Sequence, residues 1–173
     1  MQINQFNKNF TSNHYRLERK YLLFSGEDWK FKEYLASNEF RKSFPARFVN
    51  TIYFDTENFN FLDDNIQGIS KRIKVRARWY DKNFNINLEL KKKYNMNVWK
   101  PTLSLGKFES LNQFVEFLLV NKNIEKISNI VGVSIFPVLM IKYLRDYWLS
   151  YCKKYRATLD TNMQVSKFYS NNF

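Results

Sequence analysis

The sequence has very little cysteine, histidine, glycine and proline. Its 173 residues include one cysteine, Cys152, one histidine, His14, four glycines and three prolines. A single cysteine excludes an internal disulfide and is typical of a reducing compartment. A single histidine excludes a zinc site built from several histidines, and its place near the polar N-terminus argues against a histidine-dependent triad. The scarcity of glycine and proline favours strands and helices over long loops.

Long hydrophobic runs are also missing. The longest apolar stretch, residues 131–141, reads VGVSIFPVLMI, which is too short for a membrane span and contains glycine and proline. The N-terminus, MQINQFNKNFTSN, is polar and rich in asparagine, so it resembles neither a signal peptide nor a targeting helix. We therefore expect a flexible tail over residues 1–13 and one domain over residues 14–173, in a cytoplasmic protein without a membrane span.

Basic residues dominate the charge of the chain. Lys and Arg number 28 against 16 Asp and Glu, which gives a net charge of +12. The 45% hydrophobic and 18% aromatic content indicates a packed globule instead of a disordered chain. The excess of positive charge predicts an anionic partner, such as nucleic acid, a phosphorylated metabolite, polyphosphate or an anionic membrane.

Residues 72–79, RIKVRARW, alternate strictly between cationic and apolar side chains. This period of two is typical of a β-strand whose two faces differ in chemistry. Neighbours on one face of a strand lie about 7 Å apart, so four like charges in a row repel one another unless an anion compensates them. The four cations are Arg72, Lys74, Arg76 and Arg78.

Several other segments show a polar and an apolar face. They predict strands at residues 14–23, 47–55, 85–93, 134–148 and 153–163, with Pro45 in a loop. Helices are expected from about residue 25 to 36, within 56–68, over 111–120 after a Ser110–Gln113 capping box, and over 124–132. The fold class is therefore α+β, with a mostly antiparallel sheet and helices packed outside it. If the polar faces converge, the sheet must curl into a barrel with a charged lumen.

A lumen lined with cations suits a chain of phosphates. Arginine binds phosphate oxygens through two parallel hydrogen bonds, and lysine supplies a compact point charge. The polar faces also carry carboxylates, which could hold a divalent metal ion that bridges phosphate oxygens, or could simply pair with neighbouring Lys and Arg. These carboxylates are Glu18, Glu89 and Asp160.

Six motifs resemble, in order and spacing, the vacuolar transporter chaperone (VTC) domain. This domain is the polyphosphate polymerase branch of the triphosphate tunnel metalloenzymes. The motifs are RLERKY (16–21), IYFDT (52–56), KVRARWY (74–80), LELKKK (88–93), KYLRDYW (142–148) and RATLDTNM (156–163). The resemblance implies an antiparallel tunnel barrel whose basic residues hold triphosphate or polyphosphate, with Mn or Mg as the cofactor.

Individual positions follow from the same resemblance. The residues that match the family's catalytic cations are Lys20, Arg76, Arg78, Lys91, Arg145 and Arg156. Further phosphate contacts are expected from Arg16, Arg72, Lys74 and Lys93. Of these, Arg72 and Lys74 are expected nearer to the mouth of the tunnel. The metal ligands predicted from the polar faces, and not from the resemblance, are Glu18, Glu89 and Asp160.

The end of the chain departs from the family pattern. Family members continue past the RATLDT-like motif with further strands, one of which carries a metal-binding glutamate. This sequence reaches Phe173 without such a segment, so an incomplete barrel is expected. Three interpretations remain open: a fragment, a barrel completed by a partner chain, or a binder without catalysis.

The sequence therefore predicts a polyphosphate polymerase-like phosphotransferase that binds ATP or inorganic triphosphate together with polyphosphate. Two alternatives remain. One is a tripolyphosphate or nucleoside triphosphate hydrolase of the same superfamily. The other is a non-catalytic module that binds a polyanion such as nucleic acid, because a basic groove with aromatic side chains also holds single strands.

Overall fold

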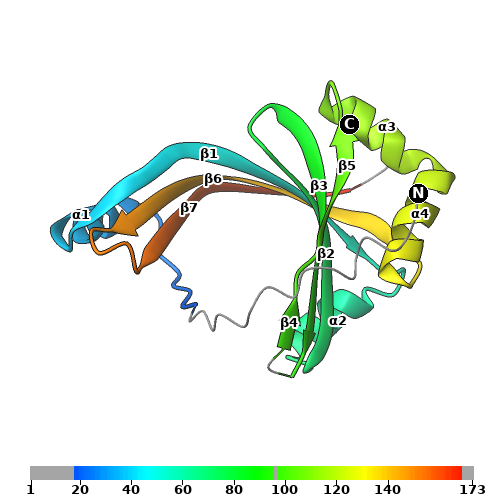
Figure 1. Cartoon of the computed structure of the whole chain (residues 1–173), viewed down its shortest axis with the longest axis horizontal. Coiled ribbons are helices and arrows are strands. Elements are labelled where there is room, and N and C mark those ends of the chain that lie inside the picture. Colours follow the sequence, from blue (N-terminus) through cyan, green and yellow to red (C-terminus); the bar gives the residue numbers. More distant parts are fainter. Residues whose placement is uncertain (1–17, 96, 169–173) are drawn as a thin grey trace.

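The computed structural model describes residues 18–95 and 97–168. These residues form a mixed α+β fold with one seven-stranded sheet and four helices, so the predicted class is confirmed (Figure 1). The expected tail at residues 1–13, together with His14 and Arg16, lies outside the described residues. In chain order the elements are α1 (Asp28–Ser37), β1 (Phe40–Asp55), α2 (Asn60–Ile66), β2 (Lys71–Tyr80), β3 (Asn83–Tyr94), β4 (Asn97–Trp99), β5 (Thr102–Lys107), α3 (Leu111–Leu119), α4 (Asn121–Val131), β6 (Phe136–Ser150) and β7 (Arg156–Lys167).

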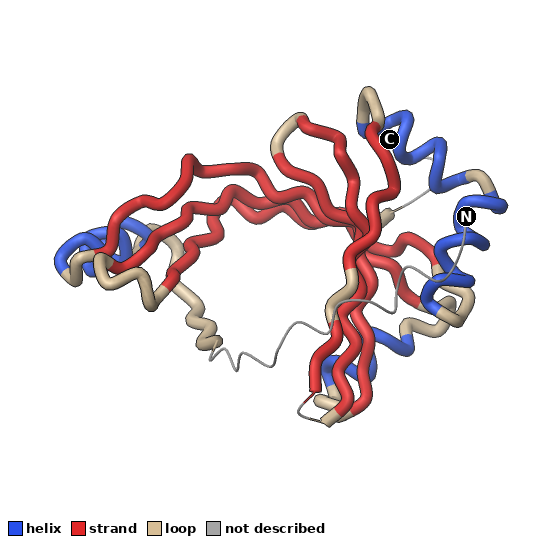
Figure 2. The backbone as a smooth tube through the Cα atoms, viewed as in Figure 1, coloured by secondary structure: helices blue, strands red, loops and turns tan. Residues whose placement is uncertain are grey.

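The sheet is antiparallel, strongly curved and open. Its strand order is β4-β3-β2-β1-β6-β7, and β5 pairs with the half of β3 that β4 leaves free. In Figure 2 the strands bend into an arch in which the β1–β6–β7 arm and the β2–β3–β4 arm diverge. Within the described residues no strand pairs with the outer edge of β7, so this part of the chain does not close the barrel expected from the sequence.

One face of the sheet carries the core. The side chains of Trp79, Ile86 and Leu88 are buried there, and they pack in one cluster with Phe114 of α3 and Ile127 of α4. Figure 1 shows α3 beside β5 and α4 beside the beginning of β6, at the end of the molecule opposite to α1. The apolar face of the alternating strands is therefore covered by helices, which leaves the polar face for the site.

Local sequence signals explain where several elements begin and end. The Ser110 hydroxyl accepts a hydrogen bond from the Gln113 backbone N–H at 3.2 Å, which confirms the predicted cap of α3. Helix α4 ends at Gly132, whose φ of 91° lies in the left-handed region that glycine adopts readily. None of the described helices is long and apolar enough to cross a membrane.

Three expectations about elements were wrong. Residues 18–23, the described part of the expected first strand, form no strand, and Leu22 is 93% exposed because no neighbouring strand pairs with this segment. Pro45 lies within β1 and not in a loop; the register with β6 shifts between Phe44 and Arg47, and such an irregularity tolerates proline. The short strands β4 and β5 were not predicted.

Candidate anion-binding site

The register of β2 and β3 builds a row of charged side chains on the polar face. Paired residues point to the same face, and alternate residues point to opposite faces. The face opposite the buried Trp79 therefore carries the four cations of β2 and their partners on β3. These pairs are Arg72 with Lys93, Lys74 with Lys91, Arg76 with Glu89, and Arg78 with Asn87.

Glu89 is the counter-ion of two arginines. Its Oε2 accepts a hydrogen bond from Arg76 Nε at 2.7 Å and lies 2.6 Å from Arg76 Nη2. Arg78 Nη1 lies 3.8 Å from the same oxygen, and Arg78 Nε donates to Thr51 Oγ1 at 3.4 Å. Burial opposes the charge of Arg76, but the attraction of Glu89 and a hydrogen bond to Tyr53 outweigh it and raise its pKa. The guanidinium of Arg76 is therefore held in place and remains charged.

A second arginine–carboxylate pair lies on β6 and β7. Arg145 Nε lies 2.6 Å from Asp160 Oδ1, and Arg145 Nη2 lies 2.7 Å from Asp160 Oδ2. This two-point hydrogen bond to Asp160 raises the pKa of Arg145. Burial raises the pKa of Tyr143, while the charges of Arg145 and Arg78 act in the opposite direction. The guanidinium carbon of Arg145 lies 5.1 Å from the centre of the Tyr143 ring.

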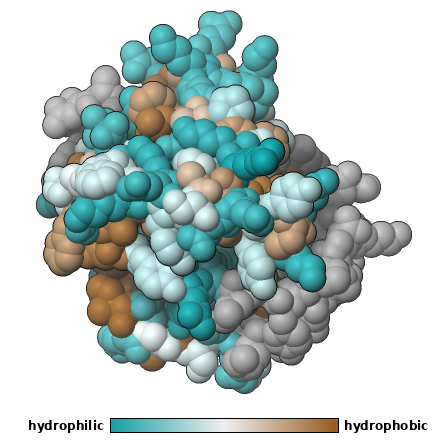
Figure 3. All heavy atoms as spheres, turned by 90° about the vertical axis from the view of Figure 1, so that its left-hand side faces the viewer, coloured by the Kyte–Doolittle hydropathy of each residue, from teal (hydrophilic) through white to brown (hydrophobic). Residues whose placement is uncertain are grey.

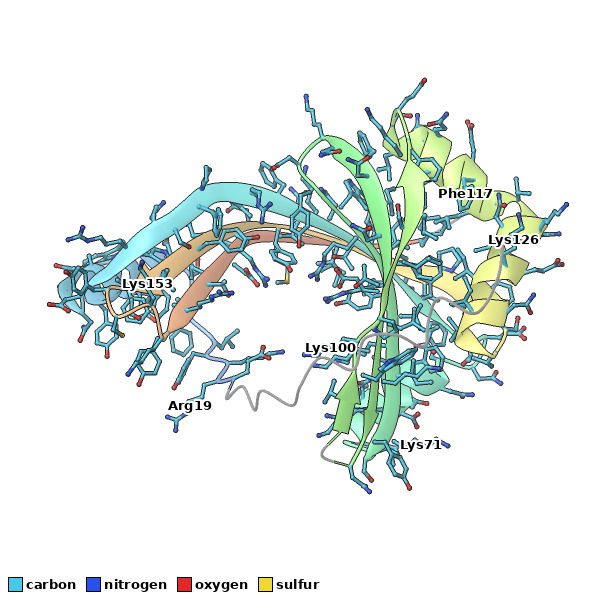
Figure 4. The ribbon with its side chains drawn as sticks, in the orientation of Figure 1. Arg19, Lys71, Lys100, Phe117, Lys126 and Lys153 are labelled. Atoms are coloured by element: carbon cyan, nitrogen blue, oxygen red, sulfur yellow. The ribbon has the colours of Figure 1, made fainter. Side chains whose placement is uncertain are left out.

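Four lysines form a third group in which positive charge is in excess. Burial lowers the pKa of Lys91, and the charges of Lys100, Lys20 and Lys74 lower it further, while Glu18 acts in the opposite direction. We call these four lysines the lysine group. Figure 4 shows the Lys100 side chain pointing from the end of β4 toward the concave side of the sheet. The charge of Lys20 acts on Lys91 although the segment of Lys20 forms no strand.

The lowered pKa of Lys91 makes anion binding depend on pH. A bound anion favours the charged form of the lysine, so binding raises this pKa again and takes up protons where free Lys91 is partly neutral. Affinity for tripolyphosphate is therefore expected to fall as the pH rises toward 10.5, the ordinary lysine value, and the fall should begin at a lower pH than for an unperturbed lysine. Calorimetric titrations with tripolyphosphate across this pH range check the predicted fall in affinity. Lys91→Arg, which keeps its charge throughout, should flatten the profile, and an unchanged profile would contradict the assignment.

The three carboxylates expected to bind metal are not gathered at one point. Glu89 is engaged by Arg76 and Arg78, and Asp160 by Arg145. Glu18 lies 4.0 Å from Lys20 and is largely exposed. In the described parts of the chain, no group of three or more His, Cys, Asp and Glu residues could hold a metal ion. Glu89 and Asp160 therefore form the ion pairs with arginine that the sequence also allowed, and a metal-binding role of the three carboxylates stays a prediction.

The remaining predicted residues lie farther from the arginine pairs. Arg72 Nη1 donates to the backbone oxygen of Ile69 at 2.9 Å, and its strand partner is Lys93. Arg156 is exposed at the beginning of β7, four residues from Asp160, which corresponds to about 13 Å along a strand. Sequence reasoning missed Lys100, because the strand β4 that precedes it was not predicted.

Fold and site together define an α+β protein with an open, curved antiparallel sheet that has helices on its apolar face and a row of cations on the other. The model of the VTC domain family matches residues 16–172, nearly the whole chain. The chain therefore belongs to the VTC domain family, as its motifs predicted. A search of the curated proteins found no match. Membership in the family suggests a function related to polyphosphate.

Proposed function

We propose that this chain binds ATP or inorganic triphosphate, together with polyphosphate, on the polar face of its sheet and transfers the γ-phosphate to the polyphosphate chain. The observation that carries the proposal is the gathering of cations on one face. Arg76, Arg78 and Arg145 are held by hydrogen bonds, and the lysine group lies beside them with positive charge in excess. Between Arg72 and Arg78 the row extends for about 20 Å along β2, which suits a chain of phosphates better than a single one.

The proposed chemistry is phosphoryl transfer by positioning and charge neutralisation. A terminal oxygen of the polyphosphate chain attacks the γ-phosphorus of ATP, the bond to the β,γ-bridging oxygen breaks, and ADP leaves with that oxygen. Arginine forks and lysine ammonium groups stabilise the charge on the transferred group, so the protein forms no covalent intermediate. If water attacked in place of the chain, the same site would be a hydrolase.

Mn²⁺ or Mg²⁺ is proposed as the cofactor on the family resemblance alone. Such an ion binds phosphate oxygens and neutralises part of their charge. Because Glu89 and Asp160 are paired with arginines, no step above depends on a metal held by the protein.

Glu89 and Asp160 are expected to compete with bound phosphate for the arginines. The variants Glu89→Gln and Asp160→Asn remove this competition, so each should bind tripolyphosphate about 3- to 10-fold more tightly, as expected for a partly exposed charge pair. Calorimetric titration without metal measures the change. Glu27→Gln, which alters a partly exposed carboxylate that pairs with Lys30 at the beginning of α1, is the matched control. Weaker binding or loss of metal-dependent activity in the two variants would instead support the metal-ligand role.

The proposed activity is tested by incubating the chain with ATP and Mn²⁺ or Mg²⁺. Long-chain polyphosphate on a gel supports the polymerase, and release of inorganic phosphate without polymer supports the hydrolase. The same incubation with Arg76→Ala shows whether the product depends on the site. If the chain binds polyphosphate but makes neither product, it is a binding module.

Additional strands are proposed to come from a partner chain, since the outer edge of β7 has no strand partner among the described residues.

Nucleic-acid binding is the second candidate function, because large aromatic side chains are exposed near the far end of the β1–β6–β7 arm. They include Trp29, which is 58% exposed, Phe44, which is 63% exposed, and Tyr151, which is 72% exposed. Figure 3, which faces this end, shows hydrophilic and apolar residues intermixed. Competition between tripolyphosphate and a single-stranded oligonucleotide separates the two candidates.

A further inference from the structure

Arg47 of β1 is held between two tyrosine rings. Its guanidinium carbon lies 4.4 Å from the ring centre of Tyr80 and 5.1 Å from that of Tyr147. Arg47 Nη2 also donates a hydrogen bond to the Tyr147 hydroxyl at 3.3 Å. Stacking on two rings fixes the plane of the guanidinium before any ligand arrives, so little conformational freedom is left to lose on binding.

The strand register places Arg47 on the polar face. Arg47 is the β1 partner of Arg145, whose side chain binds Asp160 on that face. Tyr80 is paired with Val49, two residues after Arg47, and therefore points to the same side as Arg47. Arg47 thus extends the row of cations from β2 across β1 toward β6.

Arg47 lacks a counter-ion of the kind that Arg76, Arg78 and Arg145 have. Arg76 pairs with Glu89 and Arg145 pairs with Asp160, but Arg47 forms no ion pair with any described carboxylate. Its Nε is buried and has no hydrogen-bond partner among the described residues. An unpartnered buried donor on a charged group is costly, and oxygen atoms of a bound anion would relieve that cost.

We propose that Arg47 binds a phosphate group of a long polyphosphate chain, at a position that a triphosphate held by Arg76 and Arg78 does not reach. Arg78 lies opposite Thr51, and Arg47 precedes Thr51 by four residues, or about 13 Å along β1. A triphosphate that is bound by Arg76 and Arg78 is too short to reach Arg47 as well. A longer phosphate chain spans all three arginines. Arg47 therefore selects for chain length, an inference that rests on the proposed function of the face.

The test compares two ligands, tripolyphosphate and long-chain polyphosphate, by calorimetric titration. Arg47→Ala is expected to weaken binding of the long chain about tenfold, as for one charge-assisted hydrogen-bonding group, and to leave tripolyphosphate affinity unchanged. Arg76→Ala is expected to weaken binding of both ligands. Lys126→Ala removes an exposed charge from α4, which Figure 4 shows far from the concave side, and should change neither.

Two other outcomes distinguish a failure of the inference about Arg47 from a failure of the proposed function. If Arg47→Ala binds both ligands like the unaltered chain while Arg76→Ala loses both, the inference about Arg47 fails and the proposed function stands. If Arg76→Ala loses neither, the proposed function itself fails. If Arg47→Ala does not fold, Arg47→Gln, which keeps much of the side-chain length without the charge, is measured by the same titrations with the same two outcomes.

Discussion

Replacing Arg76 by alanine is expected to weaken tripolyphosphate binding at least about a hundredfold, or about 3 kcal/mol. Two effects act in the same direction. The variant loses a guanidinium that is already oriented by Glu89 and by Tyr53. It also leaves Glu89 with Arg78 alone, at 3.8 Å, so a negative charge that Arg76 had neutralised now repels the ligand.

Calorimetric titration with tripolyphosphate measures this loss, and thermal unfolding shows whether the variant remains folded. The double variant Arg76→Ala/Glu89→Gln separates the two effects, since it removes the repelling charge and should recover part of the affinity. Lys126→Ala on α4 controls for the change in net charge. Affinity that survives in Arg76→Ala would show that phosphate does not bind at the β2–β3 row.

Replacing Trp79 by alanine is expected to lower the free energy of unfolding by about 3–5 kcal/mol, as for other large-to-small changes in a core. Trp79 is 2% exposed, and its ring centre lies 5.9 Å from that of Phe114 on α3 and 6.2 Å from that of Phe84 on β3. The ring thus joins the sheet to the helices that cover it. Because the free energy of unfolding of a whole domain is only about 5–15 kcal/mol, this one substitution removes a large fraction of the stability.

Urea unfolding followed by circular dichroism gives the free energies of the two proteins. Trp29→Ala is the matched control, because Trp29 is 58% exposed on α1 and its only ring contact among the described residues is with Lys30. Trp29→Ala should lower the free energy of unfolding by less than about 1 kcal/mol. Equal losses in the two variants would mean that the apolar face of β2 is not the main core.

The faces of the central strands could be predicted from the sequence because side chains on a strand alternate with a strict period of two. The buried Val75, Ala77 and Trp79, and the cations between them, follow directly from that period. Ser110 and Gln113 likewise predicted the beginning of α3, since a cap depends only on residues three positions apart. Local rules were sufficient where the contacts were local.

Contacts between distant segments could not be predicted in this way. Alternation places Arg76 and Glu89 on polar faces, but only the register shows that they are partners and that Glu89 is therefore an arginine counter-ion. Arg47 stands alone in a segment without alternating charges, and its stacking between Tyr80 and Tyr147 depends on three strands. The missing strand partner of β7 is also a property of the whole sheet.

The central claim is that phosphate chains bind on the concave, cation-lined side of the sheet, and lysine labelling tests it most directly. An amine-reactive reagent is applied with and without polyphosphate, and the modified lysines are identified by mass spectrometry. We predict that polyphosphate protects the lysine group, including Lys100, and leaves Lys126 and Lys153, which Figure 4 places at the two ends of the molecule, as reactive as before. Equal protection of all these lysines, or protection of the two end lysines alone, would contradict the account.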